Sequence, residues 1–318
     1  MDSHQSTNII VGVSSCLMGE PVRFDAGHKK NRFVHDVLSR YFQLESFCPE
    51  VDIGLGTPRE PIHLVLQEAG VKCVGTRNAD RDFTRQLEAS ADRQADWHRT
   101  LSGYILKKDS PSCGMERVKV YSGGVPARTG TGIYAKTMMK NFPCLPVEEE
   151  GRLDDVRIRE NFVQQVYVYA RWRALCASGL SLAKLQQFHA SHKYLLMSHN
   201  ALLTKELGGI VAKAGKTDVQ RVAETYIRKM TRVLKIVATR KGHTNTLQHL
   251  QGYLKNTLSA EDKQELTDSI QQYRKGYLPL IAPLTLLRHH FRRSPHSYIS
   301  QSHYMQPHPD ELNLLNQL

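Results

Sequence analysis

Short apolar runs alternate with stretches of helical periodicity through the first half of the chain. The strand-like runs include "NIIVGVSSC", "LESFCPE", "IHLVLQ", "VKCVGT" and "VKVY". Helical patterns occur in "NRFVHDVLSRYF", from about Asp82 to Leu106, and in "IYAKTMMKNF" after a glycine-rich turn, "SGGVPARTGTG". Strands that alternate with helices are typical of a doubly wound, mostly parallel sheet. We therefore predict an α/β, Rossmann-like domain in residues 1–150.

The second half has few strand-like runs and much 3.6-residue periodicity. Turn signals such as "ASGLS", "KAGKTD" and "RKGH" divide it, which predicts an all-α domain of about six to eight helices in residues 151–318. The tail "SYISQSHYMQPHPDELNLL" is predicted to pack back as an extended arm. Because 318 residues exceed what one core usually supports, we expect two domains with a boundary near Gly151.

Charge is divided unevenly between these halves. Residues 1–150 contain 19 Lys and Arg and 19 Asp and Glu, whereas residues 151–318 contain 24 and 12, so the second half accounts for the net charge of +12. This asymmetry indicates an anionic partner for the second half. No apolar run approaches the roughly 18 residues of a membrane span. The start "MDSHQSTNII" lacks the features of a signal peptide, so we expect a cytoplasmic protein with no membrane partner.

One helical segment, "DVQRVAETYIRKMTRVLKIVATRK", concentrates this positive charge opposite an apolar face. Only Asp218 and Glu224 accompany its basic residues. A solvated helix face is one interpretation, and a surface for the phosphates of RNA is the other, which the missing counter-charge favours. The predicted RNA-binding residues are Arg221, Arg228, Lys229, Arg232, Lys235, Arg240 and Lys241.

Three of the six cysteines share a local sequence context. Cys16, Cys48 and Cys113 each follow a strand-like run and lead directly into a turn, in "VGVSSCLMGE", "LESFCPEV" and "SPSCGME". Residues just past the carboxyl ends of parallel strands line the crevice where ligands bind, so these thiols are expected to meet there. An inert core thiol is the simpler interpretation of any single cysteine. Three cysteines in the same sequence context favour metal ligation over core packing.

The spacing of these cysteines indicates the kind of metal site. No Cys-x-x-Cys pair is present, which argues against a zinc finger or ribbon. Thiolates from widely spaced loops suit an iron–sulfur cluster, whose irons usually need four cysteines. Three cysteines would leave one iron open, and an open iron is a Lewis acid with a preference for soft atoms such as sulfur.

Polar residues beside these cysteines are candidates for catalysis. Glu50, two residues from Cys48, could take the proton of an attacking water. Ser110 or Ser112, next to Cys113, could hold that water or an intermediate through hydrogen bonds. The simpler interpretation is that Glu50 is a solvated loop carboxylate and that the serine is a turn or N-cap hydroxyl. Candidate substrate contacts, for which a solvated loop or a helix N-cap is the alternative, are Arg23, Asp25, His28, Lys29, Asp82 and Thr84.

Four segments carry a resemblance to a known family. In order, "SSCLMGEPVRFDAGHKK", "CPEVDIGLGTPREPI", "NADRDFT" and "KKDSPSCG" resemble the thiouracil desulfidase (TudS) family over about residues 8–150. The second half resembles another family once labelled as of unknown function, and the fusion is similar to the RudS group of tRNA 4-thiouridine desulfidases. The resemblance implies a [4Fe-4S] cluster on Cys16, Cys48 and Cys113, with one iron not ligated by protein, and a catalytic pair at Glu50 and Ser110.

The activity that this resemblance implies is the removal of sulfur from 4-thiouridine in tRNA. C=S is exchanged for C=O without redox change, with water as co-substrate and hydrosulfide as product. Residues 1–150 would form the catalytic domain and residues 151–318 would bind tRNA, whose target base must be flipped or exposed. One alternative is a desulfidase of free 4-thiouracil or its nucleotide. The other, from a different class, is an RNA-binding protein whose cluster senses redox state.

Overall fold

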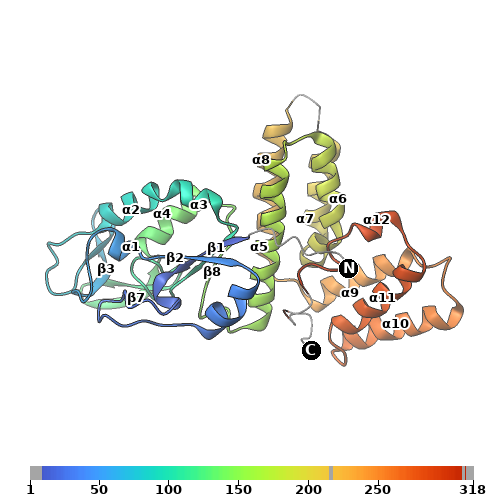
Figure 1. Cartoon of the computed structure of the whole chain (residues 1–318), viewed down its shortest axis with the longest axis horizontal. Helices are drawn as coiled ribbons and strands as arrows, with labels where there is room; N and C mark the ends of the chain where they lie inside the picture. The colour runs from blue at the N-terminus through green and yellow to red at the C-terminus, as the bar shows by residue number, and fades with distance from the viewer. Residues whose placement is uncertain (1–8, 215–217, 310–311, 313–318) are drawn as a thin grey trace. The chain divides into compact units, whose positions relative to one another are not determined.

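The computed structural model describes residues 9–214, 218–309 and 312 (Figure 1). The chain divides into two compact units, Met1–Asp155 and Val156–Leu318. This division falls a few residues after Gly151. No helix in the described ranges is both long enough and apolar enough to cross a membrane.

The first unit contains a four-stranded parallel sheet. Its spatial order is β2 (Gln43–Phe47), β1 (Ile10–Ser14), β5 (Gly103–Leu106) and β8 (Val147–Glu149), and every neighbouring pair is parallel. Nearly every residue of β1 and β5 is buried, as in strands covered on both faces. The predicted parallel α/β architecture is confirmed.

A second sheet, which the sequence did not separate from the first, completes this unit. Its order is β4 (Gly70–Gly75), β3 (Ile62–Gln67), β6 (Val118–Ser122) and β7 (Val125–Gly130). The β3–β4 and β6–β7 pairs are antiparallel hairpins, and β3 and β6 pair in parallel. The core against this sheet includes the wholly buried Cys73.

Helices α2 (Thr84–Arg93), α3 (Ala95–Thr100) and α4 (Ile133–Asn141) also belong to the first unit. Short helical turns η1 (Ser15–Leu17), η2 (Phe33–Val37), η3 (Leu38–Arg40) and α1 (Pro49–Asp52) connect the strands. Aromatic contacts tie α3 and α4 to the parallel sheet: His98 Nε2 lies 2.7 Å from the Tyr134 hydroxyl, and the Tyr134 ring meets that of Tyr104 on β5 edge-on.

Two predicted elements of this unit were wrong in extent. The helical pattern expected to reach Leu106 ends at Thr100, because Gly103–Leu106 is buried at every position and pairs between β1 and β8. The glycine-rich segment turns only at Gly123 and Gly124, with φ of 56° and 84°, and the residues after them form β7.

The second unit is helical, as predicted. Polar side chains cap five of its helices, for example Ser181 and Thr239, which accept hydrogen bonds from backbone N–H groups of the first turn. The tail expected to be extended begins with the short helix α12, and its last residues lie outside the described part of the chain apart from residue 312. The helices of this unit are α5 (Val156–Ala177), α6 (Leu182–His199), α7 (Ala201–Ala212), α8 (Val219–Leu234), α9 (Arg240–Gly252), α10 (Ala260–Lys275), α11 (Ile281–Arg293) and α12 (Ser297–Ser300).

Candidate functional site

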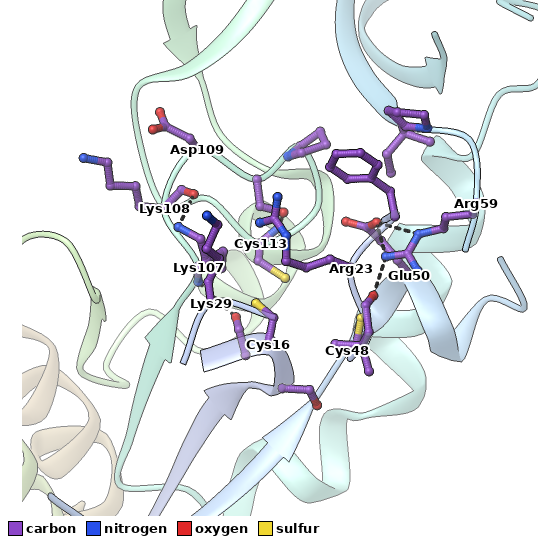
Figure 2. Close-up of a pocket in the computed structure, with 18 of the residues that line it drawn as sticks. Cys16, Arg23, Lys29, Cys48, Glu50, Arg59, Lys107, Lys108, Asp109 and Cys113 are labelled. Atoms are coloured by element: carbon purple, nitrogen blue, oxygen red, sulfur yellow. Dashed lines mark hydrogen bonds and ion pairs between the residues drawn. The ribbon is translucent and has the colours of Figure 1, made fainter. Parts of the chain in front are cut away.

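Three thiols lie together at one edge of the parallel sheet. Cys16 sits in η1 directly after β1, Cys48 follows β2, and Cys113 lies in the loop after β5. Because these three strands are adjacent and parallel, their carboxyl ends share one edge. The thiols line a cavity of about 330 Å³, and Figure 2 shows them grouped there. We call Cys16, Cys48 and Cys113 the cavity cysteines.

Burial opposes ionisation of all three thiols. It raises the pKa of Cys16 to about 11 and also raises the pKa values of Cys48 and Cys113. The sulfur of Cys48 raises the other two pKa values further, because adjacent negative charges repel. Only a bound cation would make three thiolates favourable here.

The cavity has room for more than a single metal ion. Its volume of about 330 Å³ can admit a group of several atoms beside the cavity cysteines. Across the described residues, no three His, Cys, Asp or Glu side chains are arranged to hold a metal ion. Cys73 is buried in the second sheet, and neither Cys144 nor Cys176 lines this cavity.

The turn that carries Cys113 is held by its own backbone and by the start of α4. The Cys113 N–H donates to Ser110 Oγ at 3.0 Å, and the Gly114 N–H donates to the Ser110 carbonyl at 2.8 Å. A Cβ on Gly132 would lie 2.5 Å from the Ser112 carbonyl, and one on Gly114 would lie 2.8 Å from the Ser110 carbonyl oxygen. Glycine at position 132 therefore allows α4 to start so close to the turn, and glycine at position 114 allows the turn to close on itself.

Glu50 is held on both carboxylate oxygens. Its Oε2 accepts hydrogen bonds from Arg59 Nη2 at 2.7 Å and Nε at 3.1 Å, and its Oε1 accepts one from Ser112 Oγ at 2.6 Å. The Arg59 guanidinium also donates to the carbonyls of Gly56 and Val22, at 2.6 and 2.8 Å. With side chains only 6% and 15% exposed, Arg59 and Glu50 form a largely buried ion pair (Figure 2).

Sequence reasoning missed Arg59. It lies in "CPEVDIGLGTPREPI", the segment that also contains Cys48 and Glu50, but no periodicity places it opposite a carboxylate nine residues earlier. The only sequence signal for a role of Arg59 was its place in a segment that resembles the desulfidase family.

The two serines have different positions. Ser110 lines the cavity, whereas Ser112 is wholly buried and donates to Glu50. Their hydroxyl oxygens are 3.0 Å apart. A chain of hydroxyls thus leads from the cavity to the Glu50 carboxylate.

The substrate candidates in the first loop are divided by the structure. Arg23 and Lys29 line the cavity, but Asp25 and His28 do not. Asp25 Oδ1 accepts a hydrogen bond from the Gly27 N–H at 3.1 Å, which lowers the pKa of this carboxyl group, and His28 Nδ1 accepts one from the Lys30 N–H. These two side chains shape the loop.

Asp82 and Thr84, the other two predicted substrate contacts, do not line this cavity. Asp82 Oδ1 accepts a hydrogen bond from the Thr84 N–H at 2.8 Å, and Thr84 Oγ1 accepts one from the Cys73 N–H at 2.8 Å. Asp82 also forms an ion pair with Lys72 at 3.0 Å. Both residues therefore fasten the start of α2 to β4, and Asp82 lies one residue before the N-cap position, which is Phe83.

Two further cations on the cavity wall were not predicted. Lys107 and Lys108 follow β5 and line the cavity with Lys29. Lys107 Nζ is paired with the carboxylate of Glu150, at the end of β8, while Lys108 is exposed. The positive charge of Lys107 lowers the pKa of Cys16 against the effect of burial.

The predicted basic stripe lies on α8 and on the start of α9. The apolar face of α8 is buried, including Tyr226, Met230 and Leu234, and the basic residues of α8 and Lys241 are exposed. Some of these charges are paired: Arg221 with Asp218, and Lys229 with Glu206 at 3.9 Å.

Arg240 departs from the predicted stripe. It donates to the Tyr273 carbonyl at 2.7 Å and its guanidinium lies 5.1 Å from the Tyr273 ring centre, so it is half-buried against this residue. Arg228, Arg232 and Lys235 remain exposed and form no ion pair with any described residue.

Residues 11–150 match the family model described as 2-thiouracil desulfurase, and residues 193–309 match that of a protein of unknown function, DUF1722. The predicted resemblance of the first half to the desulfidase family is thereby confirmed. Uncharacterized protein YbgA of Escherichia coli K12 is 26% identical over 159 residues, which cover 50% of this chain and 94% of the relative. Uncharacterized protein YbbK of Bacillus subtilis 168 is 28% identical over 152 residues, 45% of this chain and 97% of the relative.

Among solved structures, the chain is similar to the [4Fe-4S]-dependent thiouracil desulfidase TudS. The identity is 28%, with 46% of this chain and 94% of the other covered, and the TM-score is 0.38.

Proposed function

We propose that this protein removes sulfur from 4-thiouridine in tRNA, by replacing the thiocarbonyl sulfur with the oxygen of water. The balanced reaction consumes one water and releases hydrosulfide and a proton, with no change of oxidation state. The observation that carries the proposal is the convergence of the cavity cysteines, Glu50 and Ser110 on one cavity. The match of residues 11–150 to a desulfurase family supports the same chemistry.

The donor set of the cavity fits a [4Fe-4S] cluster held by the cavity cysteines. Three thiols from three strand ends line a space with room for several atoms, and no fourth cysteine of the described chain lines it. Iron would reverse the effect of burial on the thiol pKa values and favour the thiolates. When bound, such a cluster supplies an iron without a protein ligand, a Lewis acid suited to a thiocarbonyl sulfur.

The protein residues would handle the water and its proton. Ser110 lines the cavity and can hydrogen-bond the attacking water. Glu50 Oε1 has a lone pair beyond the one that Ser112 occupies, and the hydroxyl chain of Ser110 and Ser112 connects the cavity to it. Glu50 thus acts as the general base, and Arg59 fixes the orientation of its carboxylate.

The charge of the cavity wall supports a nucleotide as the substrate. Arg23, Lys29, Lys107 and Lys108 line it; Arg23 is paired with Asp25 and Lys107 with Glu150, whereas Lys29 and Lys108 are exposed. The acidic residues of the wall are paired as well, Asp109 with Arg128 at 2.6 Å and Glu50 with Arg59 at 2.7 Å. Exposed lysines at a cavity rim favour a phosphate group. The same charges also suit a free thionucleotide, which is the second candidate substrate.

The α8 surface supports tRNA over a free nucleotide. Arg228, Arg232 and Lys235 are exposed and not paired among the described residues, so phosphates of RNA would not have to displace a carboxylate. We expect replacement of these three residues by Gln to weaken tRNA binding and to reduce the slope of log affinity against log salt by about 1 per residue. Turnover of free 4-thiouridine 5′-monophosphate should be unchanged. Replacing Lys255, Arg274 and Lys275 by Gln, which removes the same charge elsewhere on this unit, is the matched control.

The decisive experiment is anaerobic incubation of the full chain with thiolated tRNA, with hydrosulfide and the product base both measured. Wild-type protein should yield equal amounts of hydrosulfide and uridine. Glu50→Gln should keep the visible absorption of the cluster and the affinity for tRNA, but lose turnover by about 100-fold or more. Release of hydrosulfide at the wild-type rate by this variant would contradict the role of Glu50. A protein that binds tRNA and responds to oxidants without turnover would instead be a redox sensor.

A further inference from the structure

An aromatic ring in the cavity wall has no aromatic partner among the described residues. Phe24 lines the same cavity as the cavity cysteines and Glu50, yet its side chain is 40% exposed. The other phenylalanine of the wall, Phe47, packs its ring against Trp97 and Tyr134, with ring centres 5.5 and 5.4 Å apart. Within the described ranges, no aromatic ring contacts Phe24. Its exposed area is therefore available to a ligand.

The backbone holds Phe24 in place from several sides. Its carbonyl accepts a hydrogen bond from the Arg59 N–H at 2.8 Å, and the Arg59 side chain binds the Val22 carbonyl two residues earlier. After the turn, the Lys29 N–H donates to the Cys16 carbonyl at 2.8 Å. The loop is thus anchored both to the partner of Glu50 and to a cavity cysteine. A backbone held this way keeps Phe24 at the cavity before a ligand binds.

A hydrogen-bond donor accompanies the ring. The Arg23 guanidinium lies 5.4 Å from the Phe24 ring centre. Its Nε is buried and forms an ion pair with the Asp25 carboxylate at 3.6 Å, but it makes no hydrogen bond within the described part of the chain. A flat aromatic surface beside a cationic donor matches a planar heterocycle that carries a carbonyl oxygen.

We propose that Phe24 is the stacking platform for the pyrimidine ring of the substrate, and therefore a residue that selects aromatic thiocarbonyl compounds over non-aromatic ones. This inference rests on the proposed function. Stacking of a base on an aromatic side chain is sequence-tolerant but requires the flat face of an aromatic ring, which open-chain thioamides lack. Phe24 would bind and orient the ring, while Glu50 and Ser110 act on its reacting carbon.

The test compares Phe24→Leu, Phe24→Ala and Phe24→Tyr in the full anaerobic protein, with 4-thiouridine 5′-monophosphate as substrate. The Phe24→Leu variant keeps an apolar side chain at this position but removes the aromatic ring. We expect Leu and Ala to raise KM roughly 5- to 150-fold, the equivalent of about 1–3 kcal/mol, with a smaller change in kcat. Tyr should restore KM to within a few-fold of wild type. Leu66→Ala, which truncates another exposed apolar side chain of this unit, is the control and should leave KM unchanged.

Direct binding of uridine 5′-monophosphate, measured by calorimetry, separates this inference from the proposed function. If wild-type protein binds this nucleotide and Phe24→Leu weakens binding 5-fold or more, the stacking role stands even without turnover of the thionucleotide. If turnover is normal and Phe24→Leu changes neither KM nor binding by more than 2-fold, the inference is overturned and the proposed function is unaffected. Equal loss of activity on the thionucleotide and on thioacetamide would also overturn it, because the ring would then not select aromatic substrates.

Discussion

Replacement of Arg59 by Met is expected to destabilise the first unit far more than loss of an ordinary surface ion pair. The Arg59 and Glu50 side chains are 6% and 15% exposed, and the guanidinium also serves the carbonyls of Val22 and Gly56. Removing one partner of such a buried pair costs about 3–5 kcal/mol, because the remaining charge is left desolvated. Ser112 still donates a hydrogen bond to one oxygen of Glu50 in this variant. We therefore expect the loss of unfolding free energy to lie at the lower end of this range, at about 3 kcal/mol. For a unit of this size, each kcal/mol of lost stability lowers the melting temperature by about 2–4 °C, so the variant should melt roughly 6–12 °C lower than wild type.

Thermal unfolding followed by circular dichroism, at fixed pH and salt, measures this effect. The matched control is Arg93→Met: its partner Asp52 lies 2.6 Å away, but Arg93 is 54% exposed, and surface pairs contribute only about 0–1 kcal/mol. A double-mutant cycle with Glu50→Gln should give a coupling energy of about 2 kcal/mol between the two positions. Equal falls in melting temperature for the Arg59 and Arg93 variants would refute a special contribution of the buried ion pair. A coupling energy below about 0.5 kcal/mol between positions 59 and 50 would refute it as well.

Three further predictions concern the cofactor, the pH dependence and the turn at Cys113. Replacing any one cavity cysteine by Ala should abolish the visible iron–sulfur absorption of anaerobically prepared protein and release its iron, whereas Cys176→Ala, at an exposed position, should leave both unchanged. Burial raises the pKa of Glu160 from 4.5 to about 7, so its cost is absent below pH 4.5 and grows to roughly 3 kcal/mol as pH rises through 7. Burial also lowers the pKa of His189 and of His199 to about 4, which raises stability over the same window, so the effect of Glu160 is measured as a difference between proteins. The melting temperature of Glu160→Gln minus that of wild type should increase from pH 4.5 to 7, whereas the same difference for Glu265→Gln should stay constant. Gly132→Ala places a Cβ 2.5 Å from the Ser112 carbonyl and should lower both cluster content and melting temperature; an intact cluster would show that the turn tolerates displacement.

Much of the fold follows from local patterns in the sequence. The helical periodicity of residues 219–234 separates a buried apolar face from an exposed basic one, and α8 has both faces where the pattern predicts them. The context of the cavity cysteines is also local: each follows an apolar run and precedes a turn, and in a parallel sheet this is sufficient to bring them to one edge. Side-chain period and turn chemistry depend on neighbouring residues, so the sequence alone determined them.

The tertiary structure decided which polar side chains meet. Ser112 and Glu50 are 62 positions apart, and the choice between Ser110 and Ser112 depended on which hydroxyl the sheet and α4 leave facing the cavity. The partnership of Arg59 with Glu50 and the packing of Arg240 against Tyr273 were equally hidden, because a charged residue in a loop has the same local signature whether it is solvated or paired. The second sheet was hidden for a similar reason, since a strand's own residues do not specify its partner. Pairings of this kind are set by the packing of the whole unit, where each buried polar group must find a partner.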